Sequence, residues 1–331
     1  MRFLLTDEQS DFARTLRSLL GSAQVPAAVR AWADGDAGPG RVLWSRLAAT
    51  GLFALAVPEA HEGAGPLPLE LSLGLVELGR AGVPGPVVES AAACVLLSEL
   101  ADESLAKRFL PGLALGEASA TLTLPGGSPY APDADAATYC FTVSQAGGLR
   151  LVGAPAGPLR STDPARRLSL PPADGGELLA EGPEVTRAAG VAGRWARLLT
   201  AAQCLGVGEA LLARTVEYAK QRTQFGTPIG SFQAVKHRLA DTLIALEFAR
   251  PLVWAAALSP GPGEVAAAKL AAGEASYRAA MTALQLHGAV GYTEELDLSL
   301  WLRKARPLRD AWGTPSACRA EVLRSLTPRR R

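Results

Sequence analysis

Five stretches of helical periodicity occupy the second half of the chain and restrict what it can fold into. They cover residues 186–221, 231–258, 264–287, 294–307 and 314–326, with short connections between them. Long amphipathic helices joined by short connections bury their apolar stripes most readily by packing against one another. We therefore expect residues 183–331 to form a C-terminal domain that contains a four-helix bundle.

The first 182 residues divide into a helical part and a β-like part. Thr6 and Gln9 have the spacing of a capping box, and further helices are predicted over 42–50, 68–81, 86–99 and 102–114, with "AGPG" at 37–40 as a break. From residue 117 the runs "ASATLTL", "TYCFTV", "GLRLVG" and "RRLSLPP" are short and β-like. The predicted fold is mostly α with a small β insert. It has an N-terminal helical domain over 1–116, a middle β-domain over 117–182, and the helical bundle.

Composition and charge exclude several classes of function. The 331 residues are 48% apolar and carry a formal net charge of +1. This balance gives no reason to expect nucleic acid or a membrane surface as partner. Four widely spaced cysteines form no CxxC pair, which favours reduced, buried side chains over disulfides or a metal site. No signal-peptide pattern is visible, so the expected compartment is the cytoplasm.

Two short segments next to helix ends are rich in distinctive residues. The first, "RTQFGTPIGSFQ" at 222–233, begins with Arg222, whose planar fork of donors suits a phosphate or a carboxylate. Gly226 permits a close backbone approach there, and Pro228 fixes φ for the turn. The second, "QLHGAVGYTEE" at 285–295, is by itself a helix C-cap with a loop. Taken alone, each segment is equally compatible with an ordinary connection, and His287 is predicted to be a cap or hydrogen-bonding residue rather than a catalyst.

Together the two segments resemble the acyl-CoA dehydrogenase family, as does the N-terminal stretch "LAATGLFALAVPEAHEGAG". In that family each flavin lies between two subunits, and one subunit offers two such corners to its neighbour's FAD. The resemblance therefore implies an oligomer and a set of residues that reach a neighbour's flavin, with Ala289 in place of the usual second glycine of the motif. These residues are Arg222, Gln224, Phe225, Ile229, Phe232, Gln233, Gln285, Gly288 and Ala289.

The carboxylate base of the family is missing from both of its usual positions. That base removes the proton α to the thioester carbonyl, and in most members it is a Glu directly before "GT"; here the residue is Trp312. Other members carry it in an "ER" pair on the long helix, where this chain has Ala196 before Arg197. Asp310 is an acid two residues upstream of Trp312, but that offset points about half a turn away. We therefore assign no catalytic residue, keep Asp310 as a weak alternative, and take Arg197 as a candidate contact for the acyl-CoA.

The middle domain also departs from the family. Its "TEP.AGSD" segment, which contacts the flavin ring, is absent, and the domain is about half the expected length, which argues against a whole flavin on this chain's own sheet. Arg166 and Arg167 are candidates for CoA phosphates, although surface or cap roles suit them better. The pattern resembles the short, Glu-less subunits of heteromeric acyl-CoA dehydrogenases from bacterial steroid side-chain degradation.

Three hypotheses follow from this resemblance. The chain is the subunit that completes a partner's FAD site, or a self-sufficient homo-oligomeric enzyme with another base or reaction, or a non-enzymatic protein that binds an acyl-CoA or a partner. For the enzymes, the family implies a homologous acyl-CoA dehydrogenase subunit as partner in the first case and electron-transfer flavoprotein as the electron acceptor.

Overall fold

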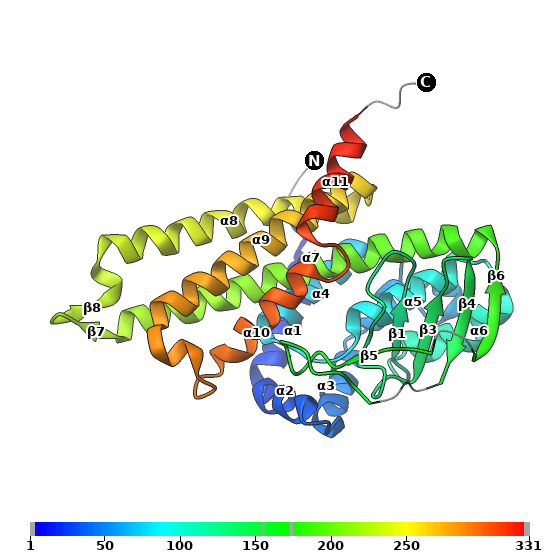
Figure 1. The fold of residues 1–331 in the computed structure, drawn as a ribbon, viewed down its shortest axis with the longest axis horizontal. Coiled ribbons are helices and arrows are strands. Elements are labelled where there is room, and N and C mark those ends of the chain that lie inside the picture. Colours follow the sequence, from blue (N-terminus) through cyan, green and yellow to red (C-terminus); the bar gives the residue numbers. More distant parts are fainter. Residues whose placement is uncertain (1–3, 154, 156, 173–174, 328–331) are drawn as a thin grey trace.

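The computed structural model describes residues 4–153, 155, 157–172 and 175–327, and most of them lie in helices. Figure 1 shows the sheet at one end of the molecule and a long helical bundle that extends to the other end. The predicted class, mostly α with a small β insert, is confirmed. The described elements before the sheet are α1 (Asp7–Ser22), α2 (Val25–Ala33), α3 (Gly38–Ala48), η1 (Phe53–Ala56), η2 (Glu59–His61), α4 (Pro68–Ala81), α5 (Val87–Glu99) and α6 (Glu103–Ala114).

The N-terminal helices follow most of the sequence signals. The capping box is present, because the side chains of Thr6 and Gln9 each bond the other's backbone N–H. The predicted break at 37–40 is present but lies earlier, at 34–37, because α3 already begins at Gly38 and a proline in the first helical turn costs no hydrogen bond. Helix α2 was not predicted. Its apolar residues Val25, Val29 and Trp32 are buried.

The middle of the chain forms a four-stranded sheet in the order β1-β3-β4-β6. Strands β1 and β3 are parallel, whereas β4 pairs antiparallel with both β3 and β6. The predicted β-like runs contribute β1, β3, β4 and β5, but β6 lies in "ELLAE", which has no β-like composition. The strands are β1 (Ala120–Thr123), β2 (Ala131–Pro132), β3 (Tyr139–Val143), β4 (Gly148–Val152), β5 (Leu168–Ser169) and β6 (Glu177–Glu181).

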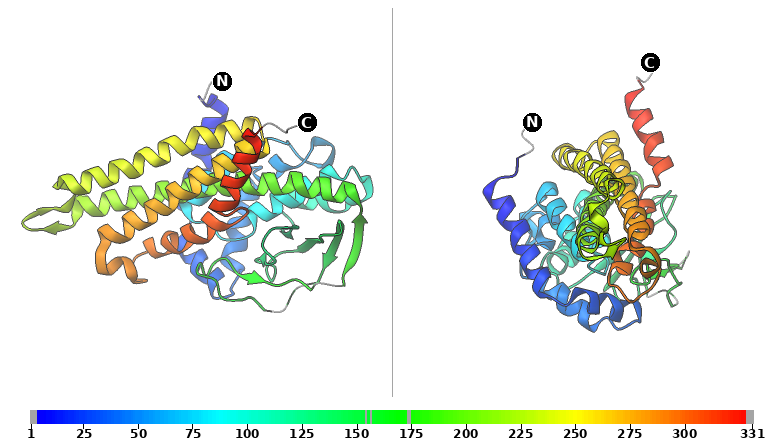
Figure 2. Two further views of the ribbon diagram at one scale, coloured as in Figure 1. Left: turned by 45° about the horizontal axis from the view of Figure 1, so that its top comes forward. Right: turned by 90° about the vertical axis from the view of Figure 1, so that its left-hand side faces the viewer.

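The C-terminal part is the predicted bundle, and in the end-on view of Figure 2 its long helices run side by side. Helix α10 begins later than the predicted 294, at Leu298, because residues 288–292 form a 3-10 turn and the chain turns again before the helix. The elements are α7 (Pro183–Gln221), β7 (Thr223–Gln224), β8 (Thr227–Pro228), η3 (Ile229–Ser231), α8 (Gln233–Leu258), α9 (Pro262–His287), η4 (Gly288–Tyr292), α10 (Leu298–Asp310) and α11 (Pro315–Leu326).

Helix α7 is the central helix of the molecule and contacts α4, α5, α8, α9 and α10. Two glycines allow α4 and α7 to cross closely. A Cβ on Gly79 would lie 2.2 Å from the carbonyl oxygen of Gln203, and a Cβ on Gly206 would lie 1.9 Å from that of Val76. By length and composition α7 could also cross a membrane, but its apolar stretch is mostly buried in the protein, as in the core helix of a soluble fold.

Candidate functional site

The corner after α7 is a short hairpin at the far end of the bundle (Figure 1). Gln224 pairs with Thr227, and the two residues between them, Phe225 and Gly226, have φ of +53° and +78°. Positive φ at both central positions is the geometry of a tight hairpin turn, for which glycine is suited and phenylalanine is not. Gly226 therefore serves the turn through its φ, and within the described part of this chain no atom lies within 4 Å of the position of its missing Cβ.

The side chains of this corner point into solvent. Phe225 is 95% exposed, and its ring meets the half-exposed ring of Phe232 edge-on at 6.3 Å between centroids. Arg222 is exposed and makes only backbone hydrogen bonds among the described residues, to Tyr218 and from Ile229. An exposed phenylalanine held at a costly φ is typical of a residue kept for a contact outside its own chain.

The second corner lies beside the first. The ring of Tyr218, one turn before the end of α7, stacks on the imidazole of His287 at 4.0 Å, and the Tyr218 hydroxyl lies 3.5 Å from the His287 carbonyl oxygen. His287 Nδ1 lies 2.8 Å from the carbonyl oxygen of Ala283, and burial lowers the His287 pKa. The His287 side chain is therefore a packing and hydrogen-bonding group.

Most of the predicted flavin-facing residues are exposed in this end region. Gln285, Gly288 and Ala289 are exposed at the end of α9, and Gly288 leaves the helix with φ of +61°. Gln224 and Gln233 are exposed as well, whereas Ile229 is half-buried. Exposed guanidinium and amide donors next to aromatic faces have the chemistry to hold a phosphate-bearing cofactor with stacked rings, so these residues fit part of an FAD presented by a neighbour.

The second region is the position of the missing base, where Trp312 is held from several sides. Trp312 has φ of +55°, and its Nε1 donates to Glu89 Oε1 on α5 at 3.0 Å. Arg197 Nε donates to the Trp312 carbonyl oxygen at 2.9 Å. The buried Lys269 donates to the carbonyl oxygen of Arg309 at 2.7 Å and approaches that of Gly313 at 3.4 Å. The turn that carries Trp312 is thus fixed by side chains from α5, α7 and α9.

The other predicted residues of this region are engaged or turned away. Ala196 is fully buried, and a methyl group cannot accept a proton. The Nε–H of Arg197 is engaged in its hydrogen bond to the Trp312 carbonyl oxygen. Asp310, the last residue of α10, is exposed and lies 3.5 Å from Arg306 one turn earlier. Neither predicted base position therefore carries a carboxylate, and Asp310 is exposed and paired with Arg306.

Little space remains beside Trp312. A cavity of about 30 Å³ is bounded by Trp312, Glu89, Asp133 and the Asp163–Lys304 ion pair. One water molecule needs about 10–15 Å³ of such a cavity, so this space holds only a few. The segment that contains Asp163 crosses this region, and Asp163 and Lys304 are 4% and 6% exposed at their side chains. This cavity fits neither an isoalloxazine ring nor an acyl chain.

Three carboxylates around this cavity were missed from the sequence: Glu89, Asp133 and Asp163. Asp133 accepts hydrogen bonds from Trp32 Nε1 at 2.9 Å and from the backbone N–H of Arg167 at 3.3 Å. Burial raises the pKa of Asp133 to about 7, against the effect of these donors. Glu89 could have been noticed as an acid in the apolar run "VVESAAACVLL", but the position of Asp133 depends on contacts across the fold.

The remaining predictions concern the arginine pair, the cysteines and metals. Arg167 is largely buried, donates to the Trp32 carbonyl oxygen at 3.1 Å and pairs with Asp135, whereas Arg166 borders the small cavity. All four cysteines are free and buried, as expected, and burial raises the pKa of the Cys94 thiol to about 12. Among the residues that the structure describes, no cluster of His, Cys, Asp or Glu could hold a metal.

Both helical parts of the chain match the domains of one family. Residues 6–117 match the acyl-CoA dehydrogenase N-terminal domain, and residues 187–327 match the acyl-CoA dehydrogenase C-terminal domain. The chain therefore belongs to the acyl-CoA dehydrogenase family, whose members are FAD-dependent oxidoreductases of acyl-CoA thioesters.

Individual relatives extend this match over the whole length. Acyl-CoA dehydrogenase IpdE2 of Mycobacterium tuberculosis is 36% identical over 97% of this chain and 96% of its own length. In the ChsE4-ChsE5 complex of the same organism, the matched chain is 26% identical with a TM-score of 0.86, over 99% of this chain and all of that chain. A steroid ACAD, Tcur3481-Tcur3483, shares the fold at 24% identity and a TM-score of 0.82, over 96% and 97% of the two chains.

Proposed function

We propose that this chain is the subunit of a heteromeric acyl-CoA dehydrogenase that lacks the base and completes the FAD site of a homologous partner. The partner supplies the carboxylate that takes the α proton of the acyl-CoA thioester. A bound FAD would supply the acceptor for the hydride that leaves the β carbon. This chain contributes the exposed corners at the end of its bundle, chiefly Arg222, Phe225 and Gln285.

The observation that carries the proposal is the environment of Trp312. General-base catalysis requires a carboxylate within hydrogen-bonding reach of the substrate proton. At the family's base position this chain has an indole that donates to Glu89, in a region with a cavity of about 30 Å³. A chain built in this way needs another subunit for the chemistry, while its exposed Arg222 and Phe225 remain available to that subunit.

Further observations support an assembly with a second subunit. Helix α8, which begins at the hairpin corner, exposes Ile244, Phe248 and Leu252 at 52%, 73% and 41%, spaced four residues apart on one face. A helix that is apolar on both faces is typical of the interior of a larger assembly. The chain matched in the ChsE4-ChsE5 complex comes from a structure of two different named components.

The proposal extends to a substrate, an electron acceptor and a compartment. A bulky acyl-CoA, such as one that carries a steroid side chain, is the proposed substrate, since one protein of this fold is described as a steroid ACAD. Electron-transfer flavoprotein is the proposed acceptor. The proposed compartment is the cytoplasm, where the buried cysteines would stay reduced.

Co-expression with a homologous subunit tests the proposal. The candidate partner carries Glu before "GT" or in an "ER" pair. We expect the chain alone to be colourless, and the co-purified complex to show flavin absorbance and to oxidise acyl-CoA. Full flavin occupancy and turnover by the chain alone would contradict the proposal.

A self-sufficient homo-oligomeric enzyme is the second candidate, because Glu89 and Asp133 are carboxylates beside Trp312. In that case the purified chain would bind FAD and turn over, and Glu89→Gln would abolish turnover. A stable homo-oligomer that binds acyl-CoA, takes up no FAD and activates no partner would instead indicate the third, non-enzymatic role.

A further inference from the structure

A separate cavity of about 270 Å³, open to solvent, lies between α1, α2, α4, α7 and α10, away from the Trp312 region. Its polar lining consists of three guanidinium groups and one carboxylate, and the rest of the wall is apolar. The guanidinium groups belong to Arg17, Arg80 and Arg214, and the carboxylate belongs to Glu77. Leu20, Val25, Pro26, Ala81 and the indole of Trp301 contribute most of the apolar wall.

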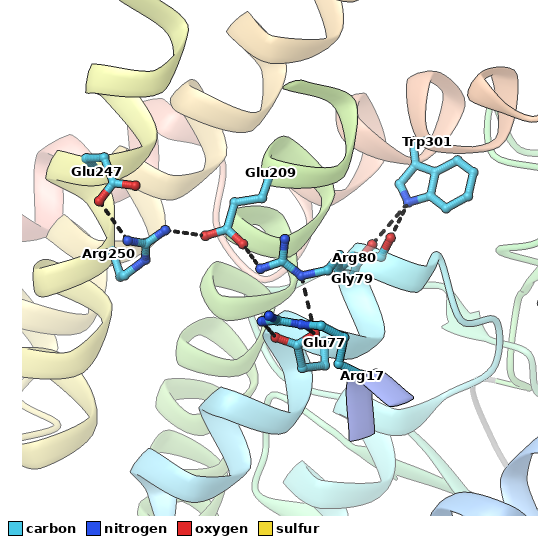
Figure 3. A network of polar contacts seen from close by, with 8 residues as sticks. All are labelled: Arg17, Glu77, Gly79, Arg80, Glu209, Glu247, Arg250 and Trp301. Carbon is cyan, nitrogen blue, oxygen red and sulfur yellow. Dashed lines mark hydrogen bonds and ion pairs between the residues drawn. The ribbon is translucent and has the colours of Figure 1, made fainter. Parts of the chain in front are cut away.

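The single carboxylate is already saturated by two of the arginines (Figure 3). Glu77 is 3% exposed and accepts from Arg17 at 2.7 and 2.9 Å and from Arg80 Nε at 3.2 Å. Arg80 also bonds Glu209, whose other oxygen accepts from Arg250 at 2.8 Å. Arg250 in turn donates to Glu247 at 2.6 Å. In this network of ion pairs each of the three carboxylates pairs with at least one arginine. The carboxylates are Glu77, Glu209 and Glu247, and the arginines are Arg17, Arg80 and Arg250.

Arg214 is the fourth arginine, and it takes no part in this network. Its guanidinium lies over the ring of Trp301, 3.9 Å from the centroid, and in the described part of the chain it makes no hydrogen bond or ion pair. Trp301 is buried and fixed by Nε1–H bonds to the carbonyl oxygens of Gly79 and Arg80, at 3.3 and 3.0 Å. The guanidinium of this exposed side chain is thus positioned by stacking, and its donors have no partner in the described protein.

The local charge balance supports an anion as ligand. The acid whose charge raises the Arg214 pKa is Asp297, and Asp297 itself pairs with Arg30 at 2.5 Å. Partial burial lowers the Arg214 pKa, although the residue is exposed to solvent, and no carboxylate of the described chain pairs with it. A planar guanidinium with free donors matches the geometry of a carboxylate, which it binds through two parallel hydrogen bonds.

We propose that this cavity is a binding site for a small organic anion, a carboxylate on a short apolar body, with Arg214 as the group that takes its two oxygens. The cavity is slightly smaller than most ligand sites, which limits the body to a few carbon atoms. The apolar wall of Leu20, Val25 and Pro26 would cover this body. The lining of this cavity shares no residue with the cavity beside Trp312 or with the hairpin corner.

Ligand-observed NMR titration with butyrate at low salt tests the site in the full chain, in whatever assembly it purifies. We expect saturable binding of butyrate and none of butyramide, which has the same shape without the charge. Arg214→Gln should weaken butyrate binding by about tenfold or more, since the charge-assisted hydrogen bonds to the carboxylate are lost. Arg278→Gln, on an exposed face of α9, is the matched control and should bind butyrate as the unsubstituted chain does.

Two further measurements make the outcome decisive. Arg214→Lys keeps the charge but loses the fork, so we expect intermediate affinity, and added salt should weaken binding to the unsubstituted chain. The proposal is overturned if butyrate does not saturate, if butyramide binds equally well, or if Arg214→Gln binds butyrate like the Arg278→Gln control. The comparison of the two ligands on the unsubstituted chain does not depend on the folding of any variant.

Discussion

Helix α7 carries both regions of chemical interest, and they differ in how their polar groups are satisfied. At its C-terminal end, Arg222 and Phe225 extend into solvent with no side-chain partner for the guanidinium in the described chain. In its middle, Arg197 bonds the turn of Trp312, whose indole bonds Glu89. A group that its own chain has already satisfied has little left for a ligand, whereas an unsatisfied exposed group can bind one. The proposed ligand contacts therefore lie at the exposed corner and not in the region around Trp312.

Replacing an aromatic ring in each region gives the largest contrast in stability. Trp312→Ala removes a ring from a packed turn and leaves Glu89 without a donor, so we expect the free energy of unfolding to fall by roughly 3 kcal/mol. Phe225→Ala at the exposed corner should change it by less than about 0.5 kcal/mol. Urea denaturation of both variants measures the difference. Equal losses at the two positions would contradict the contrast between a packed and an open region.

The pH dependence of stability tests whether the region around Trp312 is buried and has its polar groups paired within the chain. The Asp133 pKa is about 7 in the folded chain, above its unfolded value, so the folded state holds this proton more tightly. Its contribution is therefore fully present at low pH and is lost as pH rises through about 7. Between pH 5 and 7 this amounts to up to about 2 kcal/mol.

Asp133→Asn keeps the oxygen that accepts from Trp32 but cannot ionise. We expect the variant to gain stability relative to the unsubstituted chain as pH rises from 5 to 8, as measured by denaturant unfolding at each pH. Parallel pH profiles for the two proteins would show that Asp133 does not titrate as its burial implies.

At the exposed corner we expect a substitution to reduce FAD retention and to leave the free energy of unfolding unchanged. Arg222→Ala in the proposed heteromeric complex should weaken FAD retention by about tenfold, through the loss of a charge-assisted hydrogen bond. Absorbance in the flavin bands after dialysis measures the retained FAD. Arg278→Ala serves as an exposed control on α9. Unchanged retention in Arg222→Ala would remove the main support for a shared flavin.

The smallest effect is expected at Asp310. Its ion pair with Arg306 is exposed on both sides, and such pairs contribute about 0–1 kcal/mol. Asp310→Asn should therefore leave both stability and the turnover of the assembly nearly unchanged. A loss of turnover on this substitution would identify Asp310 as the base and would place the chemistry in this chain.

The sequence was informative where local pattern or a family motif determines structure. The long helical periods predicted the bundle, and the alignment of "WGT" with the family's base position identified Trp312. The hydrogen bond from Trp312 to Glu89 joins residues 223 positions apart, and no spacing rule predicts it. The ion pair of Asp163 and Lys304 spans 141 positions for the same reason. Strand β6 was missed because its sheet partner β4, rather than its own composition, makes it a strand.

The stack of Tyr218 on His287 joins the two corners at the tip of the bundle. The two rings are 69 positions apart in the sequence, yet they are in contact face to face. A substitution at either ring would therefore change the packing beneath both segments, and the two corners are to be engineered as one unit.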